Sequence, residues 1–133
     1  MIYRELHGYK YELLEEVQVP SLEDFEIDTA YIVLKDGILT IKKRYAWDGP
    51  SGPTFDTKTF MKGSLVHDAL YQLIREGLLS AEYRKYADEQ LRDICLAEGM
   101  SKFRAWYVYS GIRLFGGGAI KPQKNPRGKI VEI

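Results

Sequence analysis

His67, Asp68 and Tyr71 are the residues whose types and spacing most clearly point to a reactive site. They lie in the run GSLVHDALYQLIR, and the apolar residues of this region recur at helical spacing, which predicts a helix over residues 57–76. Residues four apart share one face of a helix, so His67 and Tyr71 lie together, whereas Asp68 is turned about 100° from His67. A histidine oriented by a carboxylate can act as a general base near neutral pH.

Asp88 is the carboxylate expected to orient this histidine. Ser80 is a good N-cap for a second helix, predicted over residues 81–98, and the short link around Gly77 makes the two helices antiparallel. His67 lies about ten residues before the link and Asp88 about ten after it, so equal rise per residue places them at the same height. Asp88 would then bind one imidazole nitrogen and leave the other as a base, and Tyr71 would donate to the same carboxylate. The alternative is a buried hydrogen-bond network without catalysis.

A turn-rich loop, DGPSGP at residues 48–53, precedes the first helix. Asp68 is expected to face this loop, and a carboxylate beside backbone carbonyls of a Gly-rich loop is a set of hard oxygen ligands that suits Ca²⁺. The predicted calcium ligands are Asp68, Asp48 and Gly49, with Asp56 as another source of a second carboxylate. A His base beside such a cation would suit the attack of water on an ester. The alternative is a rigid turn that joins sheet to helix without a metal.

The elements that must position these residues predict an α+β fold in a single domain, residues 1–133. Residues 1–47 read as an antiparallel β-meander of about three strands, in which Leu14–Glu16 is a candidate bulge and Asp36-Gly37 a tight hairpin turn. The loop 48–56 follows, then three helices over residues 57–116, and finally a C-terminal tail over residues 117–133.

The third helix is predicted over residues 102–115, with Ser101 as its cap. Trp106, Tyr107 and Tyr109 are expected on its packing face, with one or two of them left for a partner. Ser64 precedes His67 by one turn, but no G-x-S-x-G motif surrounds it, so it is interpreted as helix packing.

Composition sets bounds on the class of protein. The chain has 133 residues with 45% hydrophobic residues, which suits one soluble domain with its own core. Lys+Arg and Asp+Glu number 19 each, so no basic surplus indicates nucleic acid as the main partner. The single cysteine, Cys95, rules out an intrachain disulfide and is expected to be a small buried hydrophobic residue. No run resembles a signal peptide or a transmembrane segment.

The helix pair resembles that of phospholipase A2, particularly its small bacterial and fungal branch. The resemblance covers roughly residues 45–116 and rests on His67-Asp68-x-x-Tyr71, the preceding loop, the later Asp88, and an aromatic third helix that ends in Phe115-Gly116. It implies a three-helix phospholipase A2-like unit with His67 as base, Asp88 as its orienting partner, and a Ca²⁺ site at Asp68, Asp48 and the loop carbonyls. The implied substrate is a phospholipid or another ester.

A second resemblance is to a domain family common in tailed bacteriophages and prophages. It is carried by WDGPSGPTFDTK, GSLVHDALYQLIR and the Tyr-rich third helix. This resemblance implies a phage protein made in the host cytoplasm. Two functions are therefore expected: a calcium-assisted ester hydrolase, or a non-catalytic virion (tail or neck) or assembly protein on the same scaffold, whose partners would be other phage structural proteins.

Overall fold

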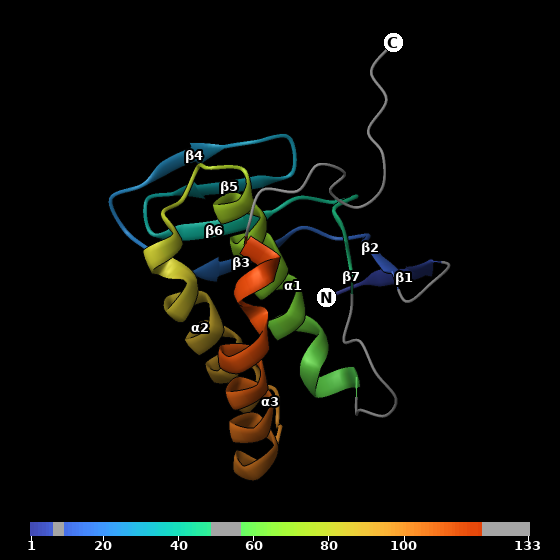
Figure 1. Ribbon diagram of the computed structural model, residues 1–133. Coiled ribbons are helices and arrows are strands. Elements are labelled where there is room, and N and C mark those ends of the chain that lie inside the picture. Colours follow the sequence, from blue (N-terminus) through green and yellow to red (C-terminus); the bar gives the residue numbers. More distant parts are fainter. Residues whose placement is uncertain (7–9, 49–56, 121–133) are drawn as a thin grey trace.

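The structure is a computed structural model that describes residues 1–6, 10–48 and 57–120 (Figure 1). Seven strands come first in the chain and the helices follow, which confirms the expected α+β fold with an antiparallel N-terminal sheet region. In the described part, no helix is both long and apolar enough to cross a membrane. The proposed tail from residue 121 onward lies outside the described residues.

The strands are more numerous and shorter than the roughly three expected. They are arranged in two antiparallel sheets, β1-β2-β7 and β3-β6-β5-β4. Their bounds are β1 Tyr3–Leu6, β2 Lys10–Leu13, β3 Val17–Pro20, β4 Glu26–Asp28, β5 Ile32–Lys35, β6 Ile38–Ile41 and β7 Ala46–Asp48. The count differs because two long extended stretches, 10–20 and 38–48, each break in the middle and pass from one sheet to the other.

The two breaks lie side by side and are held together by backbone hydrogen bonds. Leu13 N donates to Tyr45 O over 2.8 Å, and Arg44 N donates to Leu13 O over 2.7 Å. Arg44 has a positive φ of 84°, which turns the second stretch. The prediction of a bulge at Leu14–Glu16 was therefore wrong: this segment is the passage from β2 in one sheet to β3 in the other.

The hairpin predicted at Asp36-Gly37 is confirmed. Both residues have positive φ, 53° and 74°, as a two-residue turn of the primed type requires. Lys35 pairs with Ile38 directly across the turn. This turn sets the register of β5 and β6, so Leu34 and Leu39 are partners and both are fully buried.

The helices agree closely with the expected ranges. They are α1 Thr57–Arg75, a 3-10 turn η1 Ala81–Tyr83, α2 Arg84–Ala97, α3 Lys102–Phe115 and a 3-10 turn η2 Gly116–Ile120. Ser101 Oγ accepts from Arg104 N and so caps α3 as predicted, whereas Ser80 caps η1 rather than α2. Gly77 and Gly99 adopt φ of 76° and 104° where α1 and α2 end.

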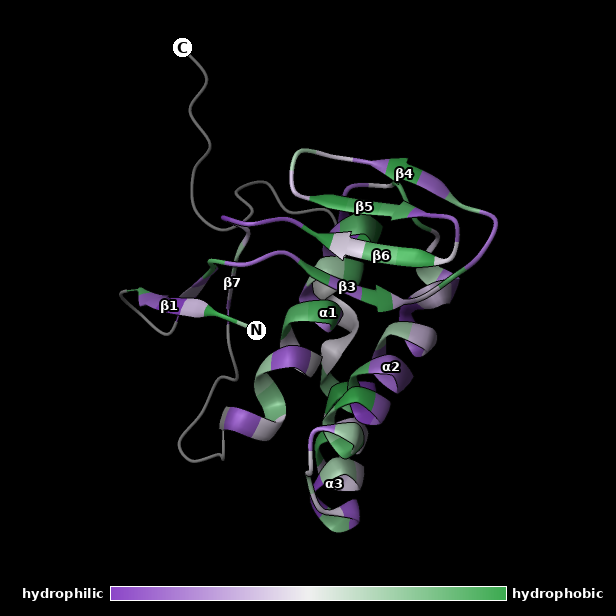
Figure 2. Cartoon of the chain, turned by 180° about the vertical axis from the view of Figure 1, so that it is seen from behind, coloured by the Kyte–Doolittle hydropathy of each residue, from purple (hydrophilic) through white to green (hydrophobic). Residues whose placement is uncertain are grey.

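The main core lies between α1 and the inner face of the sheets. In Figure 2, seen from behind, the four strands β3 to β6 lie in front and α1 lies behind them. Alternate residues of these strands are buried against apolar residues of α1: Val17, Val19, Ile32, Leu34, Leu39 and Ile41 from the strands, and Leu65, Val66, Ala69, Leu70 and Leu73 from the helix. Helix α1 is thus fixed against the sheet on one side, and its other side meets α2.

Helix α3 packs through small and aliphatic residues rather than through its aromatic ones. Ala105 is buried, and Val108 and Ile112 pack against the cluster formed by Leu91, Cys95 and Met100. Trp106 and Tyr107 are exposed, which agrees with the expectation that one or two of the three aromatic residues would be left out of the packing. Tyr109 is partly covered and lies under the Arg92 guanidinium, 4.9 Å from the ring centre.

Candidate functional site

The antiparallel pair α1 and α2 brings His67 and Asp88 into contact, as their distances from the link predicted. His67 Nε2 lies 2.7 Å from Asp88 Oδ1. Because an ionised carboxylate only accepts hydrogen bonds, Nε2 carries the proton and a neutral ring presents an unprotonated Nδ1. Among the described residues, Nδ1 has no hydrogen-bond partner. The His67 side chain is 14% exposed, and Asp88 is fully buried. This is the arrangement of a base with its orienting acid.

Tyr71 joins the same carboxylate from one turn further along α1. Its hydroxyl donates to Asp88 Oδ1 over 2.5 Å, and its ring lies 4.0 Å from the His67 ring, centre to centre. Burial first, and then the hydrogen bond to Asp88, raise the pKa of Tyr71 far above its ordinary value. The hydroxyl therefore stays protonated and serves to hold Asp88 in place.

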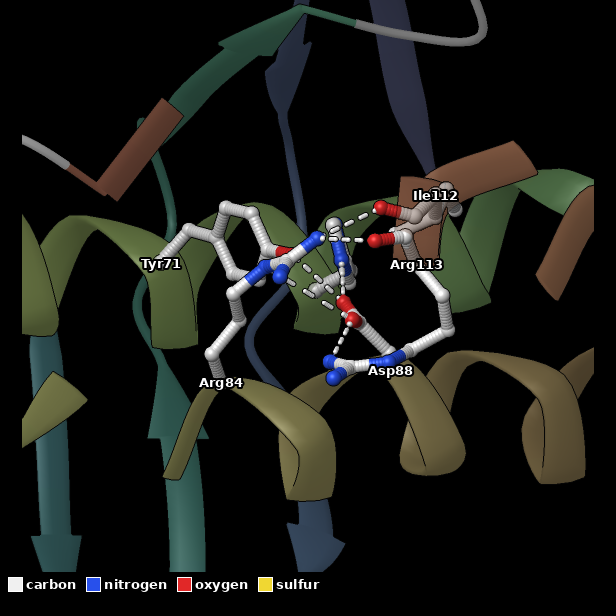
Figure 3. Close-up of polar contacts among 6 residues, drawn as sticks. Tyr71, Arg84, Asp88, Ile112 and Arg113 are labelled. Carbon is white, nitrogen blue, oxygen red and sulfur yellow. Dashed lines mark hydrogen bonds and ion pairs between the residues drawn. The ribbon is translucent and has the colours of Figure 1, made fainter. Parts of the chain in front are cut away.

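Two arginines complete the cluster, and neither was predicted from the sequence. Arg113 Nη1 donates to Asp88 Oδ2 over 2.8 Å. Arg84 Nε donates to Tyr71 Oη over 3.2 Å, and its Nη2 donates to the carbonyls of Ile112 and Arg113 over 2.7 and 3.0 Å. Figure 3 shows the Arg84 guanidinium between the Tyr71 ring and these two carbonyls.

The sequence carried a signal for one arginine only. Arg84 and Asp88 are four apart and share a face of α2. Nothing local to α3 marks Arg113, because its partner is 25 residues away in the chain.

Asp88 is ionised despite its full burial. Burial alone would raise the pKa of this carboxyl. The hydrogen bonds from His67, Tyr71 and Arg113 outweigh that effect and hold the pKa below its ordinary value. Every buried side-chain nitrogen and oxygen in the described residues has a hydrogen-bond partner. The cluster is therefore compatible with both hypotheses from the sequence, a catalytic pair and a complete buried hydrogen-bond network.

Asp68 lies where the chain leaves β7, as expected. Its Oδ2 accepts a long hydrogen bond of 3.4 Å from the backbone nitrogen of Asp48. Asp68 can supply one carboxylate ligand at the start of the loop, but residues 1–6, 10–48 and 57–120 contain no group of three His, Cys, Asp or Glu side chains placed to share a metal ion. Gly49 and Asp56 lie outside the described residues. The calcium site therefore stays a prediction that depends on the loop carbonyls.

Ser64 is used in packing, as interpreted from the sequence. Its hydroxyl accepts from Trp47 Nε1 over 3.2 Å and donates to Met61 O over 2.9 Å. Trp47 is fully buried and packs against Tyr3 and Tyr11 with ring centres 6.2 and 5.6 Å away. These contacts join the three-stranded sheet to α1 one turn before His67.

Comparison with known proteins gives no relative: no family model, no curated protein and no solved structure matches the chain. Function is therefore inferred from the geometry of this cluster. That geometry can accept a proton at His67 Nδ1, hold the histidine in one tautomer, and keep a permanent negative charge at Asp88.

Proposed function

We propose that the protein is a phage-encoded ester hydrolase of the phospholipase A2 type, with His67 as its general base. The observation that supports this best is the His67–Asp88 contact of 2.7 Å, made through Nε2, while Nδ1 has no hydrogen-bond partner among the described residues. The His67 side chain is also 14% exposed, so the ring is not sealed from solvent.

In the proposed reaction, Nδ1 of His67 accepts a proton from a water molecule while the water oxygen attacks the ester carbonyl carbon. The resulting imidazolium is stabilised by the negative charge of Asp88. The tetrahedral intermediate then collapses, the bond between the carbonyl carbon and the alcohol oxygen breaks, and the imidazolium returns its proton to that oxygen. The products are an alcohol and a carboxylic acid, which releases its proton to solvent and becomes a carboxylate.

Asp68, Asp48 and the carbonyl of Gly49 are the proposed ligands of a calcium ion. When bound, this ion would place positive charge near the ester carbonyl oxygen. Asp68 is the ligand whose position supports the proposal, because its carboxylate reaches the backbone at the end of β7. Tyr71, Arg84 and Arg113 are assigned to positioning, since all three act on Asp88 or on each other.

The test is fatty-acid release from phospholipid vesicles by the purified protein, with calcium and with a chelator. His67→Gln is expected to abolish release while keeping the far-ultraviolet circular dichroism spectrum of the parent. Lys85→Gln, an exposed residue of α2, is the matched control and should retain full activity. Absence of release from the folded parent protein at every calcium concentration would refute the hydrolase proposal.

The second candidate is a virion (tail or neck) or assembly protein of a phage that keeps the scaffold without the chemistry. A separate observation favours it: Phe103, Trp106, Tyr107, Leu114 and Phe115 of α3 are all more than half exposed. Exposed apolar side chains in such number mark interaction surfaces. Antibody labelling of purified phage particles would test this candidate, and label restricted to the host cytoplasm would count against a place in the virion.

A further inference from the structure

Four large apolar side chains lie exposed on the solvent side of α3. Phe103, Trp106, Tyr107 and Leu114 lie within an arc of about 100° around the helix axis. Their side chains are between 61% and 76% exposed, and the rings of Phe103 and Trp106 lie 6.3 Å apart. We call these four residues the α3 stripe. Figure 1 shows α3 on the side of the helices that faces away from the four-stranded sheet.

The charged residues on the same helix as the α3 stripe are all basic. Helix α3 contains Lys102, Arg104 and Arg113 and no Asp or Glu. Two such stripes brought face to face would place like charges together, which opposes a symmetric pairing of α3 with itself. The partner that fits this face is therefore apolar at its centre and acidic at its border.

Gly111 indicates that the partner approaches closely. Glycine weakens a helix interior relative to alanine, so its presence there calls for a reason. A Cβ atom at Gly111 would meet no described atom within 4 Å. With Ser110 beside it, Gly111 leaves a low point in the middle of the helix, between the aromatic pair and Leu114, where a second backbone can come near.

A surface of the required kind exists elsewhere on the same chain. A groove of about 510 Å³ runs along α2 beside the end of β3. Its apolar lining includes Pro20, Tyr86, Ile94 and Ala97, and its acidic residues are Glu89 and Asp93. Arg92 also borders the groove, where its Nε lies 3.0 Å from Asp93 Oδ1, so the charged residues of the lining sum to one negative charge. The groove is open to solvent rather than enclosed, so side chains of a partner can lie along it.

The α2 groove and the α3 stripe lie on different faces of the molecule. Asp88, Leu91 and Cys95 occupy the face of α2 that is buried against α1 and α3. Glu89, Asp93 and Ala97 lie roughly on the opposite side of the same helix. One copy of the protein can therefore use both surfaces at once.

We propose that copies of this chain associate head to tail, with the α3 stripe of one copy seated in the α2 groove of the next. Trp106 and Tyr107 enter the groove, and Lys102 and Arg104 lie near Glu89 and Asp93. Because the two surfaces differ, the interface is heterologous and repeats until a ring closes or a filament grows. This association does not depend on catalysis by His67, and its test measures mass rather than activity.

The test compares three forms of the full chain by sedimentation velocity over a range of concentrations. The parent should form species larger than its 15.3 kDa chain. Trp106→Asp removes the stripe and Ala97→Arg fills the groove with a bulky positive side chain. The association of each variant alone should be at least tenfold weaker, so each should be a monomer at concentrations where the parent assembles. Tyr31→Asp replaces an exposed aromatic residue in the bend between β4 and β5 and should assemble like the parent.

The decisive sample is an equal mixture of Trp106→Asp and Ala97→Arg. Only one pairing is then possible, the intact stripe of Ala97→Arg in the intact groove of Trp106→Asp, so the mixture should give a dimer that cannot grow further. A monomeric parent at all concentrations would overturn the proposal. A mixture that stays monomeric while the parent assembles would overturn it equally, because the interface would then not join these two surfaces.

Discussion

Arg113, two residues before the end of α3, donates a hydrogen bond of 2.8 Å to Asp88, in the first half of α2. The same carboxylate also accepts hydrogen bonds from His67 and Tyr71 of α1. The buried side chain of Asp88 in α2 is thus joined by hydrogen bonds to both α1 and α3. The pKa of Arg113 is raised chiefly by its hydrogen bond to Asp88, so Arg113 and Asp88 are both ionised near neutral pH. The orientation of His67 and the position of α3 therefore depend on one another.

Replacing Arg113 by Gln should loosen this junction. The loss of a hydrogen bond between charged groups costs about 1.5–3 kcal/mol, and the lower half of this range is expected because Arg113 is 33% exposed and partly screened. Urea unfolding followed by circular dichroism measures the difference. Arg4→Gln is the matched control, since Arg4 is 57% exposed and pairs with Glu12 away from the helices, so its loss should change stability by less than about 1 kcal/mol. Equal effects of the two substitutions would contradict the assigned role of Arg113.

Asp88 should give the protein an acid-sensitive stability. Its pKa in the folded state is below the ordinary value of 3.8, because donated hydrogen bonds outweigh burial. A lowered folded-state pKa means that the stabilisation is complete above the unfolded-state pKa and is lost as pH falls through the folded-state value. The parent should therefore be more stable than Asp88→Asn by roughly 3 kcal/mol from pH 5 to 8.

Below pH 4 this difference should shrink, and urea unfolding of both proteins at several pH values measures it. A difference between parent and Asp88→Asn that is independent of pH down to pH 2 would show that the charge of Asp88 is not what stabilises the fold.

The part of the site that follows from local rules was predictable. Helical spacing placed His67 and Tyr71 on one face, and the count of residues on either side of Gly77 placed Asp88 opposite them. The contact of 2.7 Å between His67 and Asp88 confirms this reasoning. The agreement is possible because two antiparallel helices with a short link leave little freedom in their relative height.

The position of Arg113 and the division of the strands into two sheets could not be predicted from local spacing and pattern. The position of Arg113 depends on how α3 crosses α2, and this follows from side-chain packing rather than spacing. The two sheets arise because the stretches 10–20 and 38–48 bend at the same level, and a period-two pattern does not reveal a bend of this kind. The sequence did not tell which of Trp106, Tyr107 and Tyr109 would be covered, because close packing of α3 is made through the small residue Ala105.

Cys95 should be inert to thiol reagents in the native protein. Its side chain is fully buried, and burial raises its pKa to about 12, so the reactive thiolate is scarce near neutral pH. Labelling by Ellman's reagent should be slow in buffer and rapid and stoichiometric in concentrated urea. Rapid labelling of the folded protein would mean that α1 and α2 separate readily near Gly63.

Two glycines in helix interiors should respond in opposite directions to the same substitution. A Cβ at Gly63 would lie 2.7 Å from Cys95 Sγ and 3.1 Å from the carbonyl oxygen of Leu91, so α1 and α2 would have to move apart. Gly63→Ala should therefore lower the free energy of unfolding by about 1–3 kcal/mol. Gly111→Ala meets nothing within 4 Å and should raise it by about 1 kcal/mol through helix propensity.

Urea unfolding at low protein concentration measures both effects without interference from association between copies. The double variant Gly63→Ala/Cys95→Ala separates the two clashes at the helix crossing, because it removes Sγ and leaves the Leu91 carbonyl in place. The stability that Gly63→Ala costs in the Cys95→Ala background should therefore be smaller than the stability that it costs in the parent. A Gly63→Ala protein as stable as the parent would show that α1 and α2 are not held at the close distance seen here, and the His67–Asp88 contact would then lack its rigid support.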